Sequence, residues 1–108
     1  MNKRKNLHMA DYKVLNSRGK EISTDVSLHP GEVVAMELEA RGIAKSVFAG
    51  QLGMRQSHFS ELVHGKRNVS AAIAIKLENL LGIPAEYWMR VQVYHDLFVE
   101  RNRAGNAA

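Results

Sequence analysis

Glycines interrupt a helical pattern of apolar residues through most of this chain. Between residues 30 and 101, apolar side chains recur at spacings of three and four, as they do along one face of an α-helix. The glycines that interrupt this pattern are Gly42, Gly53, Gly65 and Gly82. Glycine adopts the left-handed backbone that ends a helix at little steric cost. No segment between residues 30 and 100 alternates with period two, so we expect an all-α domain of five short helices.

Signals at the helix starts agree with this division. Pro30 suits a first helical position, and Glu32 behind it faces the positive end of the helix dipole. Ser70 is a good N-cap for a later helix, whereas Ala44 stands where a Ser or Thr cap is usual. The predicted helices cover about residues 30–41, 45–52, 56–64, 70–81 and 84–101.

The first residues follow a different pattern. Residues 12–15 and 21–26 resemble two strands, and residues 16–20 resemble a Gly-containing turn between them. An isolated two-stranded hairpin is marginal in water, so the segment packs on the helices, orders on a partner or is disordered. These three alternatives stay open. We therefore divide the chain into an N-terminal extension, residues 1–28, that is mobile or hairpin-like, a helical domain, residues 29–100, and a C-terminal tail, residues 101–108.

The net charge of +4 is distributed unevenly. Half or more of the excess lies in the two ends, but residues 54–69 also carry Arg55, Lys66 and Arg67 against Glu61 alone. Residues 84–100 are net negative. A positive band inside the folded part favours a polyanionic partner.

Several function classes are excluded by what the sequence lacks. It contains no cysteine, and its five histidines include no pair four residues apart, so we expect neither a disulfide nor a metal site. It has no Gly-rich phosphate loop or nucleophile elbow, and we expect no enzymatic activity and no cofactor. It also has no apolar run of signal-peptide or membrane-spanning length, which predicts a cytoplasmic protein without a membrane partner.

The spacing of residues 45–62 is typical of a helix-turn-helix. Counted from Lys45, Ala49 is fifth, Gly53 ninth, Phe59 fifteenth and Leu62 eighteenth. A small Ala49 lets the next helix approach, and Gly53 permits the left-handed backbone of a tight turn. Phe59 and Leu62 fix the underside of the following helix. Its other face is then left to the solvent.

That outer face is short and polar, as on a helix that reads bases in the major groove. Gln bonds bidentately to adenine, and Glu accepts from the cytosine amino group. The predicted base-reading residues are Gln56, Ser57, His58, Ser60 and Glu61. The residues predicted to contact phosphates are Lys45, Arg55, Lys66, Arg67 and Asn68. On spacing alone, a small helical bundle with a solvated polar face remains an alternative.

Further motifs resemble a known family. His29-Pro30-Gly31-Glu32, the segment from Gly65 to Ser70, and Trp88-x-x-x-Gln92-x-x-x-Asp96-Leu97 are similar in combination to the HigA (VapI-like) antitoxins. These belong to the Xre/Cro–C1 helix-turn-helix superfamily. The resemblance covers residues 29–97 and implies a lambda-repressor-like fold. Two features depart from the family pattern, namely Ala44 in the cap position and an extension longer than usual before His29.

The resemblance implies a homodimer that represses its own operon and silences a RelE-like ribonuclease toxin, HigB. The partners expected are therefore operator DNA, this toxin and a second copy of the chain. A stand-alone Xre-type regulator without a toxin is the alternative, and a protein-interaction module that has lost DNA binding is a third reading. We expect the last helix to form the dimer, because it carries apolar residues on more than one face. The candidate interface residues are Trp88, Val91, Tyr94, His95 and Phe98.

Overall fold

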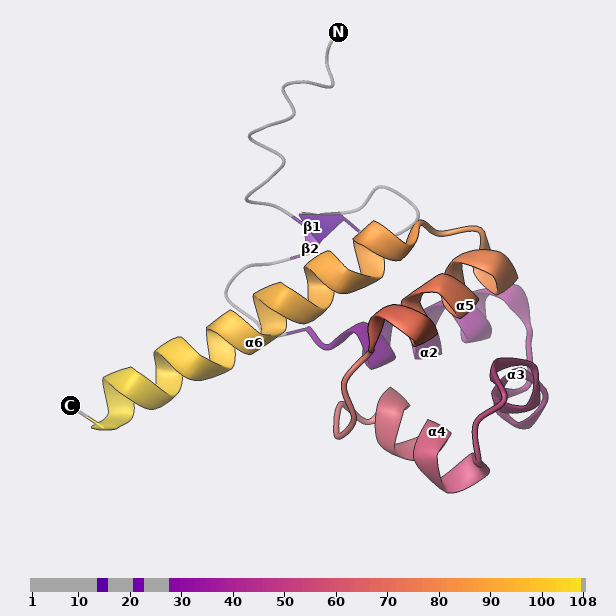
Figure 1. Ribbon diagram of the computed structural model, residues 1–108, viewed down its shortest axis with the longest axis horizontal. Helices are drawn as coiled ribbons and strands as arrows, with labels where there is room; N and C mark the ends of the chain where they lie inside the picture. The colour runs from indigo at the N-terminus through magenta and orange to yellow at the C-terminus, as the bar shows by residue number, and fades with distance from the viewer. Residues whose placement is uncertain (1–13, 16–20, 23–27, 108) are drawn as a thin grey trace, which may run out of the picture.

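Figure 1 shows the computed structural model, which describes residues 14–15, 21–22 and 28–107. Its helices are α2 (Pro30–Arg41), α3 (Lys45–Leu52), α4 (Gln56–Val63), α5 (Ala71–Leu81) and α6 (Ala85–Ala107). The five helices confirm the predicted all-α domain. The first four agree with the predicted ranges to within a residue at each end.

The strands predicted before the domain are present as a short hairpin. β1 (Val14–Leu15) pairs antiparallel with β2 (Glu21–Ile22), and Val14 lies opposite Ile22. The pairing confirms a hairpin-like element in the N-terminal extension. The other residues of segment 1–27 lie outside the described residues. The alternatives of disorder and of ordering on a partner therefore stay open.

Both ends of α2 are closed by local hydrogen bonds. His29 is the N-cap, and its side chain accepts from a backbone N–H of the first turn while Glu32 accepts from the His29 N–H. At the other end Gly42 has φ 69°, and the Ile43 N–H donates to the Leu38 carbonyl at 2.9 Å. These bonds satisfy backbone groups that a helix terminus otherwise leaves unpaired.

The core lies between α2, α3, α4, α5 and the first half of α6. Trp88 and Leu77 are at its centre, each without exposed surface, and the Trp88 indole donates to the Ile83 carbonyl at 3.1 Å. α5 packs along α6, and α2 packs against α4 and α6. α6 therefore packs against both α2 and α5.

The last helix is longer than predicted. α6 continues past Arg101 to Ala107, so the expected tail, residues 101–108, is helical through Ala107. The prediction of a helix end near Arg101 was wrong because no proline follows it, and a helix already formed extends at little cost. An Arg103–Glu100 pair at 2.6 Å supports this turn. Figure 1 shows the C-terminal half of α6 extending beyond the other helices. In the part of the chain that the structure describes, no helix is long and apolar enough to cross a membrane.

Candidate nucleic-acid interface

α3 and α4 form a helix-turn-helix joined by a tight turn. Gly53 has φ 73°, as the spacing predicted, and the Met54 N–H donates to the Ala49 carbonyl at 2.9 Å. Ala49 is fully buried, which permits the close approach. The Phe48 and Phe59 rings lie 6.1 Å apart between the helices. This packing fixes which side of α4 faces outward.

The outward side of α4 carries the residues predicted to read bases. Gln56, Ser57, Ser60 and Glu61 are exposed and His58 is half-buried, while the opposite side of the helix lies in the core. The structure therefore brings these five side chains together on one surface.

Gln56 is held in a defined orientation. Its side-chain amide nitrogen donates to the Ser46 carbonyl on α3 at 3.1 Å. Its Oε1 atom and its second amide hydrogen remain for groups outside the chain. Gln56 therefore keeps one acceptor and one donor, the two groups that a bidentate contact to adenine uses.

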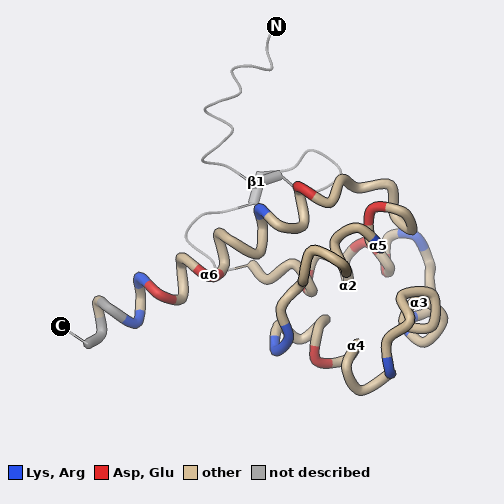
Figure 2. Tube along the Cα trace, in the orientation of Figure 1, with Lys and Arg blue, Asp and Glu red and all other residues tan. Residues whose placement is uncertain are grey.

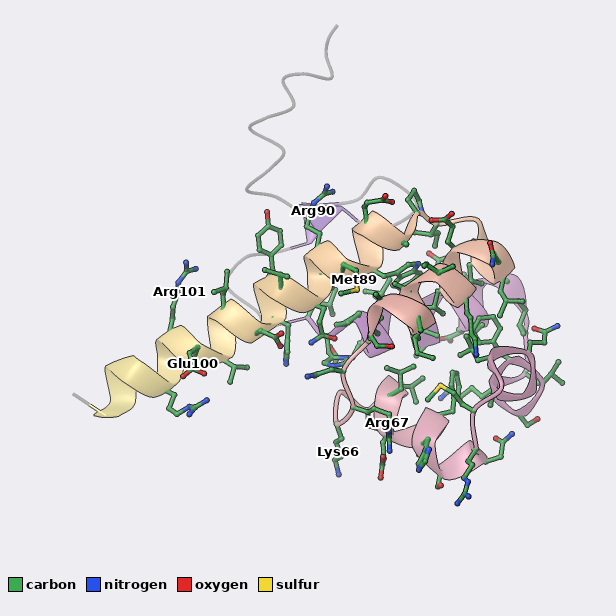
Figure 3. The ribbon with its side chains drawn as sticks, in the orientation of Figure 1. Lys66, Arg67, Met89, Arg90, Glu100 and Arg101 are labelled. Atoms are coloured by element: carbon green, nitrogen blue, oxygen red, sulfur yellow. The ribbon has the colours of Figure 1, made fainter. Side chains whose placement is uncertain are left out.

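Basic residues lie at the start of α3, before α4 and after α4 (Figure 2). Lys45, Arg55 and Lys66 are exposed, and Arg67 is half-buried. Arg67 donates to Glu61 at 2.8 Å, so one predicted phosphate contact pairs with one predicted base contact. Figure 3 shows Lys66 and Arg67 on the loop after α4, pointing away from α6. The pair neutralises a carboxylate that would otherwise repel a phosphate backbone.

A shallow hollow lies between the turn before α4 and the loop after it. It has a volume of about 430 Å³ and is lined by Arg55, His58, Arg67 and Asn68, with Ser70 at the start of α5. Two guanidinium groups beside a helix N-terminus make this hollow attractive to an anion. It adjoins the outward face of α4, so both belong to one surface.

The structure corrects part of the candidate dimer interface. Trp88 is 0% and Val91 2% exposed in the single chain, so their side chains belong to the core and have no surface for a partner. The prediction was wrong for these two residues because apolar character alone does not distinguish the inner from the outer face of α6. Tyr94, His95 and Phe98 are half-buried and keep some surface.

Sequence reasoning missed exposed apolar residues on the same helix. Val93 is 48%, Leu97 40% and Val99 42% exposed. Val93 and Leu97 are four residues apart and lie on the side of α6 opposite Trp88. Their position opposite Trp88 identifies them only once the burial of Trp88 is known, so no signal in the sequence alone would have found them.

Two side chains with shifted pKa values lie outside the outward face of α4. They are His29, the N-cap of α2, and Tyr87 on α6. Burial, together with the neighbouring His95, lowers the pKa of His29 below its usual value. Burial and the nearby Glu37 raise the pKa of Tyr87 to about 12. Both groups are therefore neutral at physiological pH and act as packed polar side chains. Among residues 14–15, 21–22 and 28–107, no group of three or more His, Asp or Glu is placed to hold a metal ion.

Comparison with known proteins places this geometry in a family. The family model described as Helix-turn-helix matches residues 34–88, which span α3, α4 and their turn. The chain is 36% identical over 74 residues to antitoxin HigA-1 of Vibrio cholerae, covering 68% of this chain and 70% of that protein. It is 31% identical over 72 residues to virulence-associated protein I of Dichelobacter nodosus, covering 66% and 67%.

A solved structure agrees with these sequence relatives. The Pseudomonas aeruginosa antitoxin HigA, solved with the higBA promoter, aligns with a TM-score of 0.70 and 26% identity, covering 76% of this chain and 90% of that one. The chain belongs to the Xre-type helix-turn-helix family and is similar within it to the HigA antitoxins and VapI-like proteins.

Proposed function

We propose that this protein is the antitoxin of a toxin–antitoxin module and that it represses its own operon by binding operator DNA. The observation that carries the proposal is the polar outward face of α4 between basic loops. Exposed acceptors and donors on a helix of this kind read base edges, while Lys45, Arg55 and Lys66 contact phosphates. The relatives named as antitoxins, one of them solved with promoter DNA, support this function. Operator binding also implies a cytoplasmic protein.

The repressor acts as a homodimer. One helix-turn-helix makes few base contacts, so useful affinity requires two, held about 34 Å apart over successive turns of DNA. We assign the dimer contact to the outer face of α6, where Tyr94 and Phe98 of the original set are joined by Val93 and Leu97. Apolar side chains on an extended helix gain by pairing with a second copy.

The second partner is a RelE-like ribonuclease toxin, HigB. The family resemblance supports this partner, and the motifs that carry it span residues 29–97. Residues 1–27 are our candidate for an arm that covers the toxin. Deleting them should weaken toxin binding and leave operator binding in place. Unchanged toxin affinity would exclude the arm.

Binding to the DNA upstream of the gene tests the repressor function. Fluorescence anisotropy compares a labelled upstream duplex with a scrambled duplex of the same composition. We expect a preference of about 10³-fold or more at physiological salt, as for other operator-binding proteins. Equal affinity for the two duplexes would leave a protein-interaction module as the better reading.

A second experiment separates the antitoxin from a stand-alone regulator. The chain is co-expressed with the neighbouring reading frame and tested for co-purification and for rescue of growth. An antitoxin retains the neighbouring protein and restores growth. A regulator without a toxin binds the upstream DNA equally well but does neither.

A further inference from the structure

Gln92 is a buried glutamine on α6 whose whole side chain is hydrogen-bonded. It is 4% exposed, and burying an amide costs free energy unless the amide has partners. Its Oε1 accepts from the Val69 N–H at 2.7 Å. Its Nε2 donates to Asn68 Oδ1 at 3.2 Å and to Asp96 Oδ1 at 3.0 Å. Two of these partners lie far away in the chain, on the loop that follows α4.

That loop, residues 65–70, carries part of the proposed phosphate contact surface. Its near end is fixed locally, because the Gly65 and Lys66 N–H groups donate to carbonyls of α4. Its far end has no such local support at Val69, which is 2% exposed and whose N–H is taken by Gln92. Lys66 and Arg67 stand between these two fixed points, on the side away from α6 (Figure 3).

The underside of the loop rests on α2 and α6. A Cβ at Gly65 would lie 3.5 to 3.9 Å from the Cβ, Cγ and Cδ2 atoms of His29, so the loop backbone packs directly on the His29 side chain. The His29 and His95 rings meet edge to face at 4.8 Å. The loop therefore packs on His29, which contacts His95 of α6, and its end is hydrogen-bonded to Gln92 of the same helix. The loop cannot move without breaking contacts from α6.

We propose that Gln92 is a positioning residue for DNA binding, which sets the location of Lys66 and Arg67 relative to the reading face of α4. The inference rests on the proposed operator binding. It accounts for Gln92 and Asp96 of the Trp88-x-x-x-Gln92-x-x-x-Asp96 motif, since they occupy successive turns of the face that meets the loop. A purely structural glutamine would affect stability but not the number of phosphates contacted.

The test is the salt dependence of DNA binding by Gln92→Leu, which has similar size but no polar atoms. We expect affinity for the upstream duplex and for a scrambled duplex to fall together, by about 10-fold, because phosphate contacts are independent of sequence. The slope of log affinity against log salt should shrink by about one phosphate contact. Wild-type affinity and slope would overturn the inference.

A matched control separates positioning from general destabilisation. Ile83→Ala removes core packing at the other end of α5, away from the loop. It should lower Tm as Gln92→Leu does and keep the wild-type salt slope. An equal loss of slope in both variants, measured well below their Tm, would also overturn the inference.

A charge-conserving double variant provides a rescue. Gln92→Glu keeps the acceptor for Val69 but sets two carboxylates together with Asp96. Adding Asp96→Asn returns the net charge and lets the new amide donate to the new carboxylate, while Asn68 turns its amide so that its nitrogen, in place of Oδ1, faces position 92. We expect the double variant to regain most of the slope lost in Gln92→Glu, and no recovery would contradict the assigned geometry. If the wild type does not prefer the upstream duplex, the proposed function fails, whereas the slopes on scrambled DNA still test Gln92.

Discussion

Gly31 lies at the start of α2, against the end of the proposed reading helix. A side chain built there would place its Cβ 1.7 Å from the Leu62 carbonyl oxygen on α4. That atom belongs to the backbone, so it cannot rotate away. The missing side chain is therefore what lets α2 and α4 pack at this distance.

Gly31→Ala should destabilise the protein by about 3 kcal/mol, the upper part of the range for overpacking. Gly50→Ala is the matched control, because a Cβ there meets no atom within 4 Å. Since alanine favours a helix interior, Gly50→Ala should stabilise by about 0.5–1 kcal/mol. Denaturant unfolding at neutral pH measures both changes. Similar changes in the two variants would contradict the packing described for α2 and α4.

His29 predicts a pH dependence of stability. Because burial and His95 lower its pKa, the folded protein binds this proton less readily than the unfolded chain does. The contribution of neutral His29 to the free energy of unfolding is fully present above the ordinary pKa of 6.5. It is lost as the pH falls through the lower pKa of the folded state.

His29→Asn keeps a side-chain oxygen able to cap α2 and removes the titrating group. Between about pH 7.5 and pH 5.5, the Tm of the wild type should fall further than that of His29→Asn, because only the wild type loses this linkage. Scanning calorimetry at both pH values measures the difference. Parallel decreases would show that His29 is not the group responsible.

At the scale of elements, α3 and α4 were predictable because the signals that define them are local. These signals are Gly53 in the turn, the small Ala49 on α3 and the apolar underside of α4. All of them lie within α3, α4 and the turn between them. Ala44 provides no side-chain cap, yet α3 begins at the predicted Lys45. Burial of Phe48 and Leu52 holds α3 in place despite the missing cap, which is typically worth about 1 kcal/mol.

The two kinds of contact assigned to this motif predict different mutant behaviour. Gln56→Ala should lose roughly 1–3 kcal/mol at particular base pairs, because it removes the acceptor that reads an amino group. Lys66→Ala should weaken operator and scrambled DNA alike and lower the salt slope by about one, because its partner is a phosphate. Binding titrations against single-base-pair operator variants and over a salt series measure both. If Gln56→Ala changed specific and scrambled binding equally, α4 would not be the reading helix.

For the whole molecule, the length of α6 has the largest consequence. Its first half completes the core, and its second half extends beyond the other helices with apolar residues uncovered by any described part of the chain (Figure 1). The same helix thus holds the loop of the proposed phosphate contacts through Gln92 and carries the surface proposed for a second copy.

Leu97→Glu should weaken the dimer by about 2 kcal/mol or more, as expected for a central apolar contact. The matched control is Ile75→Glu, which places the same charge on α5 at a residue 54% exposed. Sedimentation equilibrium over a concentration series gives both dissociation constants. If Ile75→Glu dissociated the dimer and Leu97→Glu did not, the interface would lie on α5.

The five helices of the domain, apart from the end of α6, the turn at Gly53 and the outward face of α4 could be predicted from the sequence. Each depends on residues within a few positions of one another, since helix hydrogen bonds and caps connect near neighbours. The burial of Trp88 and Val91, the Arg67–Glu61 pair and the bond between Gln92 and Val69, 23 residues apart, could not be predicted from the sequence. These contacts join separate elements, and periodicity does not record which face of α6 meets its neighbours or which polar groups close the gaps between them.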